Sequence, residues 1–165
     1  ALKRVSKQYD YIVLDCPPAL NMLTLNALVA ADSILIPMQC EYYALEGLSA
    51  LLGTMEKIKA SVNSKIEIEG IVRTMYDPRS RLALDVSKQL KTHFGNKLYK
   101  TVIPRNIRLA EAPSYGIPIN LYDKRSKGAK SYLALAKEFH KKIQSKQKID
   151  SGQTLGQKLK RMVTK

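Results

Sequence analysis

The chain has 165 residues, of which 45% are apolar, so it can bury the core of one domain. Its 28 basic and 14 acidic side chains give a formal charge of +14, which favours polyanionic partners such as nucleic acid or an acidic membrane surface. No apolar run approaches the roughly 20 residues of a transmembrane helix, and the N-terminus lacks a signal-peptide pattern, so we expect a cytoplasmic protein.

Aliphatic runs alternate with amphipathic segments along the chain. Strands are predicted at Tyr11–Asp15, Ser33–Met38, Glu67–Met75 and Leu98–Ile103, with a weak fifth at Pro118–Tyr122. Helices are predicted at Met22–Ala31, Tyr43–Val62, Arg81–Phe94, Ile107–Ala112 and about Gly128–Ile143. The first two strands lack polar alternation, which is typical of strands covered on both faces. The pattern predicts an α/β fold, a doubly wound and mostly parallel sheet whose ligands lie beyond the carboxyl ends of the strands.

The last part of the chain differs in composition from the rest. Residues 141–165 hold eight basic side chains and one acidic side chain. Lys, Gln, Ser and Gly dominate from Ser145 onward, so we expect a domain at 1–144 and a disordered basic tail at 145–165. The chain opens at Ala1 without a methionine and soon reaches a strand-like segment, so we expect its start to be internal to a longer protein.

Asp15 ends the aliphatic run Tyr11–Asp15 and is followed at once by Cys16, Pro17 and Pro18. A carboxylate at a strand tip can hold Mg²⁺ through a water beside nucleotide phosphates, as a Walker B aspartate does. The alternative is an aspartate that only ends a strand or caps a turn. This short pattern does not separate the two interpretations.

Several longer segments together resemble ParA/Soj partitioning ATPases, which have a P-loop NTPase-like fold. They are DCPP at 15–18, LTLNAL at 23–28, IPMQCEYYALEG at 36–47, TMYD at 74–77 and VIPRNIRLAEAPS at 102–114. The resemblance covers roughly residues 8–140. It implies the C-terminal part of an ATPase domain that uses ATP/ADP and Mg²⁺, with Asp15 as the Walker B acid.

The resemblance also implies a switch formed by Cys16, Pro17 and Pro18, and an ATP-dependent homodimer whose interface lies near Glu41 and Tyr42. A ParB-type protein would stimulate hydrolysis. The sequence departs from the family because it contains no G-x-x-x-x-G-K-[ST] phosphate-binding loop, so we expect the chain by itself to hydrolyse no ATP.

By the same resemblance, Pro104, Arg105 and Asn106 supply the adenine pocket, which Met75 and Asp77 complete. Arg73 interrupts an otherwise apolar strand, and burying its charge unpaired would be costly. We expect an ion pair near the end of the sheet, the alternative being a ligand contact.

Basic residues on three loops or helix starts are candidates for sequence-independent contacts with DNA phosphates. They are Arg79, Arg81, Arg108, Lys124, Arg125 and Lys127. The family match implies non-specific binding of double-stranded DNA and nucleoid association, whereas the alternative is that these side chains are only solvated. A second hypothesis is a MinD-like membrane-cycling ATPase, because Leu155, Leu159, Met162 and Val163 fall at helical spacing among basic residues.

Overall fold

A computed structural model describes residues 2–17 and 19–163, and side chains up to residue 147. The strands are β1 (Ser33–Gln39), β2 (Glu67–Tyr76) and β3 (Leu98–Pro104). The α-helices are α1 (Met22–Ala30), α2 (Tyr42–Ser61), α3 (Arg81–Phe94), α4 (Ile107–Glu111), α5 (Ile119–Tyr122) and α6 (Lys127–Val163). Short 3-10 turns lie at η1 (Leu2–Arg4), η2 (Gly95–Lys97) and η3 (Ala112–Tyr115).

The three strands form one sheet in the order β1-β2-β3, and β2 pairs with β3 in parallel. Ile71 lies opposite Leu98 and Arg73 opposite Val102, with an irregularity in the pairing between Arg73 and Tyr76. Because parallel neighbours need a crossover, α3 connects these two strands. The predicted α/β class is confirmed.

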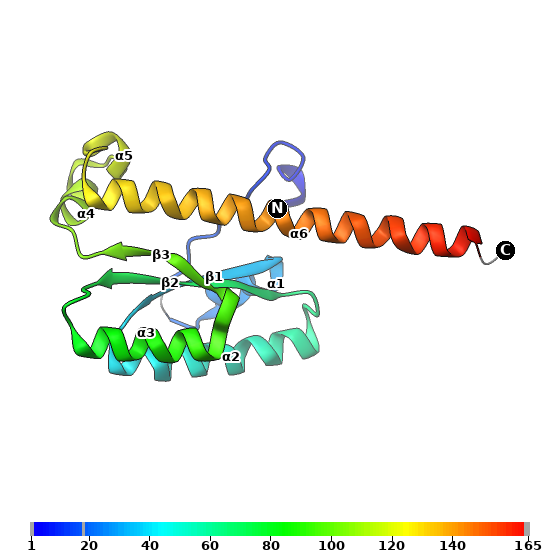
Figure 1. The fold of residues 1–165 in the computed structure, drawn as a ribbon, viewed down its shortest axis with the longest axis horizontal. Coiled ribbons are helices and arrows are strands. Elements are labelled where there is room, and N and C mark those ends of the chain that lie inside the picture. Colours follow the sequence, from blue (N-terminus) through cyan, green and yellow to red (C-terminus); the bar gives the residue numbers. More distant parts are fainter. Residues whose placement is uncertain (1, 18, 164–165) are drawn as a thin grey trace. The chain divides into compact units, whose positions relative to one another are not determined.

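The chain divides into two compact units, and the second consists of residues 36–44 and 70–165. In this unit α3 lies on one face of the β2–β3 pair and α6 on the other (Figure 1). Val72, Tyr99 and Ile103 form its buried core, against which Leu135 and Phe139 of α6 pack. Helices therefore cover both faces here, as a doubly wound sheet requires.

The first unit consists of residues 1–35 and 45–69. Leu28, Met55, Ile58 and Ile66 form its buried core. The side-chain amide of Asn63 donates hydrogen bonds to the carbonyls at the end of α1, at 2.8–3.1 Å. These bonds satisfy acceptors that a helix end leaves without partners.

Two strand predictions are wrong. Residues 11–15 have no regular secondary structure and are exposed, because a strand needs a hydrogen-bonded neighbour and the three-stranded sheet does not include this segment. The segment Pro118–Tyr122 also forms no strand. Its residues turn into α5, in which the Pro118 carbonyl accepts from the N–H groups of Leu121 and Tyr122.

The burial of β1 also differs from the prediction that both of its faces are covered. Ile36 and Met38 are buried, whereas Leu35 and Pro37, which alternate with them, are exposed. β1 is the outer strand on its side of the sheet, and its side chains alternate between a packed face and an exposed one.

Helix α6 continues past the predicted end at Ile143 to Val163, and so includes most of the segment predicted to be disordered. The apolar positions behind the membrane hypothesis, from Leu155 to Val163, have side chains outside the described residues. Within the described part of the chain, we find no helix with an apolar stretch that could cross a bilayer.

Candidate functional site

A cavity of about 430 Å³ lies at the carboxyl ends of β2 and β3. Its lining comes from the segment after β2, the segment after β3 and the start of α6: Tyr76, Asp77, Pro78, Arg79, Pro104, Arg105, Asn106, Ile107 and Lys127. The backbone N–H of Arg105 donates to the Tyr76 carbonyl at 3.5 Å and joins the two strand ends. This edge of a parallel sheet is where α/β proteins bind ligands.

Four of the five residues predicted for the base pocket line this cavity, namely Asp77, Pro104, Arg105 and Asn106. Met75 is not among the lining residues. Its backbone has φ of 50°, a left-handed conformation that is costly for a residue with a β-carbon, and its side chain is half exposed. The strained residue immediately precedes the cavity wall formed by Tyr76 and Asp77.

Asn106 is the N-cap residue of α4, and its side-chain oxygen Oδ1 is buried without a hydrogen-bond partner in the described part of the chain. A buried acceptor without a donor costs free energy, so an unsatisfied one in a cavity wall needs an explanation. A ligand that presents an N–H donor to Oδ1 would supply the missing bond.

Asp77 and Arg79 form a two-point ion pair at the rim of the cavity. Arg79 Nε donates to Asp77 Oδ1 at 3.0 Å, and Arg79 Nη2 donates to Asp77 Oδ2 at 2.9 Å. These bonds, with a third from the Arg79 backbone N–H, lower the pKa of Asp77 to about 2. Asp77 is therefore a carboxylate at neutral pH and neutralises Arg79 locally.

Arg108 is paired with two carboxylates at the corner formed by α4, η3 and α5. Its Nη1 atom donates to Glu111 Oε2 at 2.9 Å, and its Nε atom lies 3.6 Å from Asp123 Oδ2. The Tyr122 hydroxyl donates to Glu111 at 3.0 Å, and the Tyr122 ring stacks on Tyr115. Hydrogen bonds from Arg108 and Tyr122 hold the pKa of Glu111 below its usual value.

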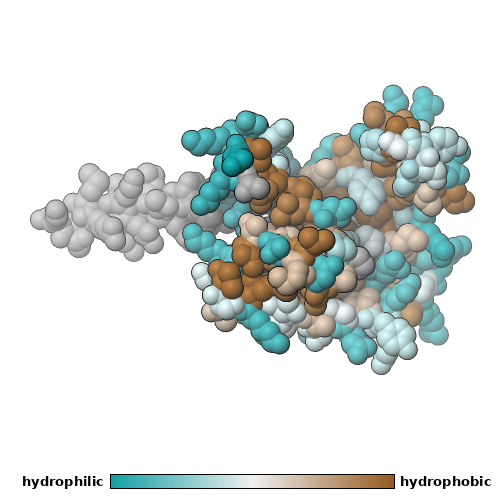
Figure 2. Space-filling view, turned by 180° about the vertical axis from the view of Figure 1, so that it is seen from behind, coloured by the Kyte–Doolittle hydropathy of each residue, from teal (hydrophilic) through white to brown (hydrophobic). Residues whose placement is uncertain are grey.

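The other predicted DNA contacts are exposed. Arg81 is the first residue of α3 and Lys127 the first of α6, while Lys124 and Arg125 lie in the turn before α6. Asp123 Oδ1 shapes that turn by accepting hydrogen bonds from the N–H groups of Arg125 and Ser126. Figure 2 shows hydrophilic side chains beside apolar ones on the α4–α5 corner, at its upper right.

Asp15 and Cys16 lie in the exposed segment before α1, in the first unit. The Cys16 thiol lies 3.7 Å from the Leu14 carbonyl, and the Pro17 carbonyl accepts a hydrogen bond from Thr24 at 3.4 Å. Pro18 lies outside the described residues. Thr24 thus ties the segment after Asp15 to the first turn of α1.

Glu41 and Tyr42 stand at the start of α2, in the second unit, and both are exposed. The Tyr42 ring meets the Tyr43 ring edge to face, with centroids 5.5 Å apart. Both rings are more than 70% exposed, which is unusual for such large apolar groups and is compatible with a contact surface.

Among the described residues, Arg73 bonds to neutral oxygens and not to a carboxylate as predicted. Its guanidinium donates to Ser87 Oγ at 2.7 Å and to the carbonyls of Tyr99 and Lys100 at 2.9 and 3.2 Å. Its positive charge also lowers the pKa of the Cys40 thiol, but burial, the larger effect, raises it. Arg73 thus links β2 to α3 and β3 and is distinct from the cavity wall.

Comparison with known proteins identifies relatives over most of the chain. A family model described as an AAA domain matches residues 1–68. The sporulation initiation inhibitor protein Soj of Bacillus subtilis is 57% identical over 84% of this chain and 54% of its own length. The chromosome partitioning protein ParA of Myxococcus xanthus is 51% identical over 86% of this chain and 50% of its own length. The chain belongs to the ParA/Soj family. It spans about half the length of the curated relatives it matches.

A solved structure shares the α/β fold of this chain. Cobyrinic acid a,c-diamide synthase from Mycobacterium smegmatis, with bound ATP analog and magnesium, is 30% identical and superposes with a TM-score of 0.65. The match covers 80% of this chain and 48% of the synthase. The ParA/Soj family is one of P-loop ATPases, and nucleotide with magnesium is its expected cofactor.

Proposed function

We propose that this chain supplies the base pocket and DNA-binding surface of a ParA-type ATPase that partitions a chromosome or plasmid. The observations that carry the proposal are a cavity at the carboxyl ends of two parallel strands and Asn106 in its lining, whose Oδ1 atom is buried without a hydrogen-bond partner among the described residues. Sequence similarity to chromosome partitioning proteins supports the biological setting.

The cavity fits an adenine base. Asn106 Oδ1 is an acceptor that needs a donor, and the exocyclic amino group of adenine is one. Guanine presents a carbonyl oxygen at that position, which would face Oδ1 as a second acceptor. Pro104 and Ile107 add apolar surface for the faces of the ring.

By the family resemblance Asp15 would hold the magnesium ion; the residue is exposed, and a carboxylate is a ligand that Mg²⁺ takes while it retains several waters. When bound with nucleotide, magnesium neutralises charge on the phosphates. Cys16, Pro17 and Pro18 would form the switch beside them, and the Pro17 carbonyl accepts a hydrogen bond from Thr24 of α1. The sequence contains no phosphate-binding loop, so we expect no phosphate release from the chain incubated with ATP and Mg²⁺. Steady turnover would contradict this expectation.

The proposed cycle requires partners. ATP would join two copies through the Cys16–Pro18 switch and the surface around Glu41 and Tyr42, and the dimer would bind double-stranded DNA. A ParB-type protein would stimulate hydrolysis and so release the DNA. The exposed tyrosines at the start of α2 support a contact surface there.

A ligand-binding experiment tests the base pocket. Ligand-observed NMR with the chain should detect adenosine more strongly than guanosine, and Asn106→Ala should reduce this preference by about fivefold or more, the worth of one hydrogen bond. Asn120→Ala is the control, since Asn120 is exposed on α5 and is not a lining residue of the cavity. Equal binding of the two nucleosides by the unmodified chain would refute the adenine assignment.

A second experiment tests the DNA surface. Replacing Arg79 and Arg108 together with glutamate should weaken binding to a double-stranded DNA fragment by at least about tenfold, because two positive side chains on the proposed surface become negative and repel the phosphates. Circular dichroism of the double variant serves as the control for folding. Unchanged DNA affinity would place the DNA surface elsewhere.

A further inference from the structure

The six predicted DNA contacts fall into two groups. Arg79 and Arg108 are held by carboxylates of their own chain, Arg79 by Asp77 and Arg108 by Glu111 and Asp123. Within the described part of the chain, the remaining contacts make no ion pair; they are Arg81, Lys124, Arg125 and Lys127. The paired arginines therefore differ electrostatically from the free basic side chains around them.

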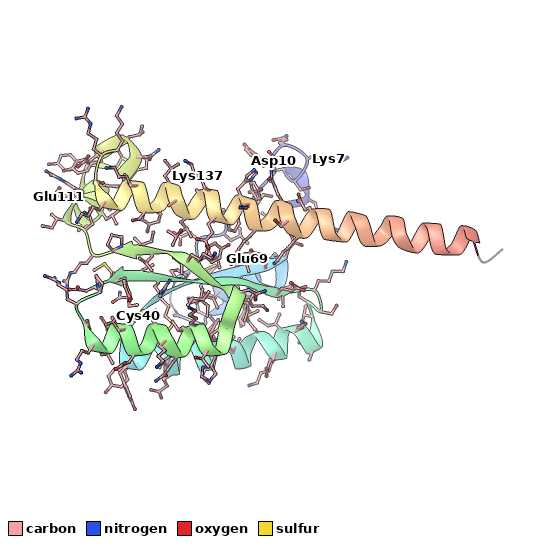
Figure 3. The ribbon with its side chains drawn as sticks, in the orientation of Figure 1. Lys7, Asp10, Cys40, Glu69, Glu111 and Lys137 are labelled. Carbon is pink, nitrogen blue, oxygen red and sulfur yellow. The ribbon has the colours of Figure 1, made fainter. Side chains whose placement is uncertain are left out.

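Both paired arginines remain open to solvent. The Arg79 side chain is 88% exposed and the Arg108 side chain 53% exposed. Glu111 lies at the outer corner of the second unit, where Figure 3 labels it. A phosphate can therefore reach each guanidinium, but it must displace or share a carboxylate that already fills part of its donor fork.

We propose that Asp77 and Glu111 are intrachain counter-ions that compete with DNA phosphates for Arg79 and Arg108 and thereby lower the affinity of the chain for DNA. The inference rests on the proposed DNA-binding function. Each carboxylate accepts the donors that a phosphate would use and repels the phosphate by its own charge. The affinity is then set by the acidic residues as well as by the basic ones, which suits a protein that must release DNA during its cycle.

The geometry makes the two pairs unequal. Asp77 accepts both side-chain donors of the Arg79 fork and the backbone N–H of the same residue. Glu111 accepts one Arg108 donor and is held in place by the Tyr122 hydroxyl. Asp77 therefore blocks more of its arginine, and its removal should have the larger effect.

The test is DNA affinity of the whole chain, measured by fluorescence anisotropy with a mixed-sequence double-stranded fragment at several salt concentrations. Asp77→Asn should tighten binding about three- to eightfold and Glu111→Gln about two- to fourfold, because each frees an arginine for one more phosphate. Asp85→Asn is the matched control. It removes the same charge from an exposed position on α3 that forms no ion pair with the described residues, and it should change affinity by less than about twofold.

A double-mutant cycle separates competition for Arg79 from the effect of removing any one negative charge from the chain. In an Arg79→Gln background the effect of Asp77→Asn should fall to that of Asp85→Asn. An equal gain from Asp85→Asn in the unmodified chain, or weaker binding by Asp77→Asn, would overturn the counter-ion proposal. If the unmodified chain binds no DNA at low salt, the proposed DNA-binding function is wrong. This outcome differs from one in which the chain binds DNA but the variants do not change its affinity as expected. Circular dichroism of each variant checks that the fold is retained.

Discussion

Glu138 of α6 satisfies the outer edge of β3. Its carboxylate accepts hydrogen bonds from the backbone N–H groups of Lys100 and Thr101 at 2.8 and 2.9 Å, and from Thr101 Oγ1 at 2.7 Å. One turn later on the same helix, Lys142 donates to the Asn96 carbonyl and lies over the Tyr99 ring. Because β3 ends at the cavity, these contacts hold one wall of the candidate site in place.

The hydrogen bonds of Glu138 should make part of the free energy of unfolding depend on pH. Burial raises the pKa of Glu138, but hydrogen bonds from Thr101 and Lys100 together outweigh burial, so the pKa lies below its usual value of 4.5. A lowered folded-state pKa means that the stabilisation is complete above about pH 4.5 and is lost as the pH falls through the folded-state value. Glu138→Gln should cost about 1 kcal/mol in the free energy of unfolding at pH 7 and less at about pH 3. Urea unfolding measures both, with exposed Glu56→Gln as the control. An equal cost at both pH values would contradict this role.

At the scale of elements, the packing of β2 against β3 depends on a glycine. Gly70 has no side chain where the Tyr99 ring crosses the sheet, and a β-carbon there would meet that ring and approach the Lys97 carbonyl to 2.6 Å. Tyr99 is fully buried, and the Lys97 carbonyl belongs to the backbone, so neither can move aside. The strand sequence alone predicts β2 but not this requirement.

Gly70→Ala should therefore destabilise the chain by about 2–3 kcal/mol through overpacking. Gly47→Ala is the matched control, because Gly47 lies in α2 with open space where the new methyl group would be. It should leave the free energy of unfolding unchanged or raise it by up to about 1 kcal/mol. Thermal unfolding of the two variants measures the difference. Equal midpoints would show that the close approach to Tyr99 is relieved without cost.

At the scale of the whole molecule, the positive charge should dominate DNA binding. The four basic residues without ion pairs in the described part of the chain, Arg81, Lys124, Arg125 and Lys127, provide about four phosphate contacts. About four contacts predict that affinity falls roughly a hundredfold between 50 and 200 mM salt. Mixed, A·T-rich and G·C-rich fragments should bind alike, because phosphate contacts carry no sequence information. Anisotropy titrations test both, and a flat salt dependence or a preferred sequence would contradict the interpretation.

Local pattern was sufficient for most elements of this chain. Helical spacing predicted α1, α2 and α3 to within a residue or two, and the aliphatic runs predicted β1, β2 and β3. Two ion pairs were also accessible from spacing, since Arg108 and Glu111 stand three residues apart on a helix and Asp77 and Arg79 share a turn. These features depend on residues close together in the chain, so the sequence alone is enough to predict them.

The sequence by itself determined the α/β class, the ParA/Soj resemblance, the positions of Asp77 and Pro104 at the ends of two strands and that of Arg81 at a helix start. Only the tertiary structure decided that residues 11–15 stay outside the sheet, that Asp77 and Asn106 line one cavity and that Asp123 joins the Arg108 network. The physical reason is that strand pairing, burial and long-range ion pairs depend on groups distant in the chain. A local pattern specifies which groups need partners, and the packed fold specifies which partners they receive.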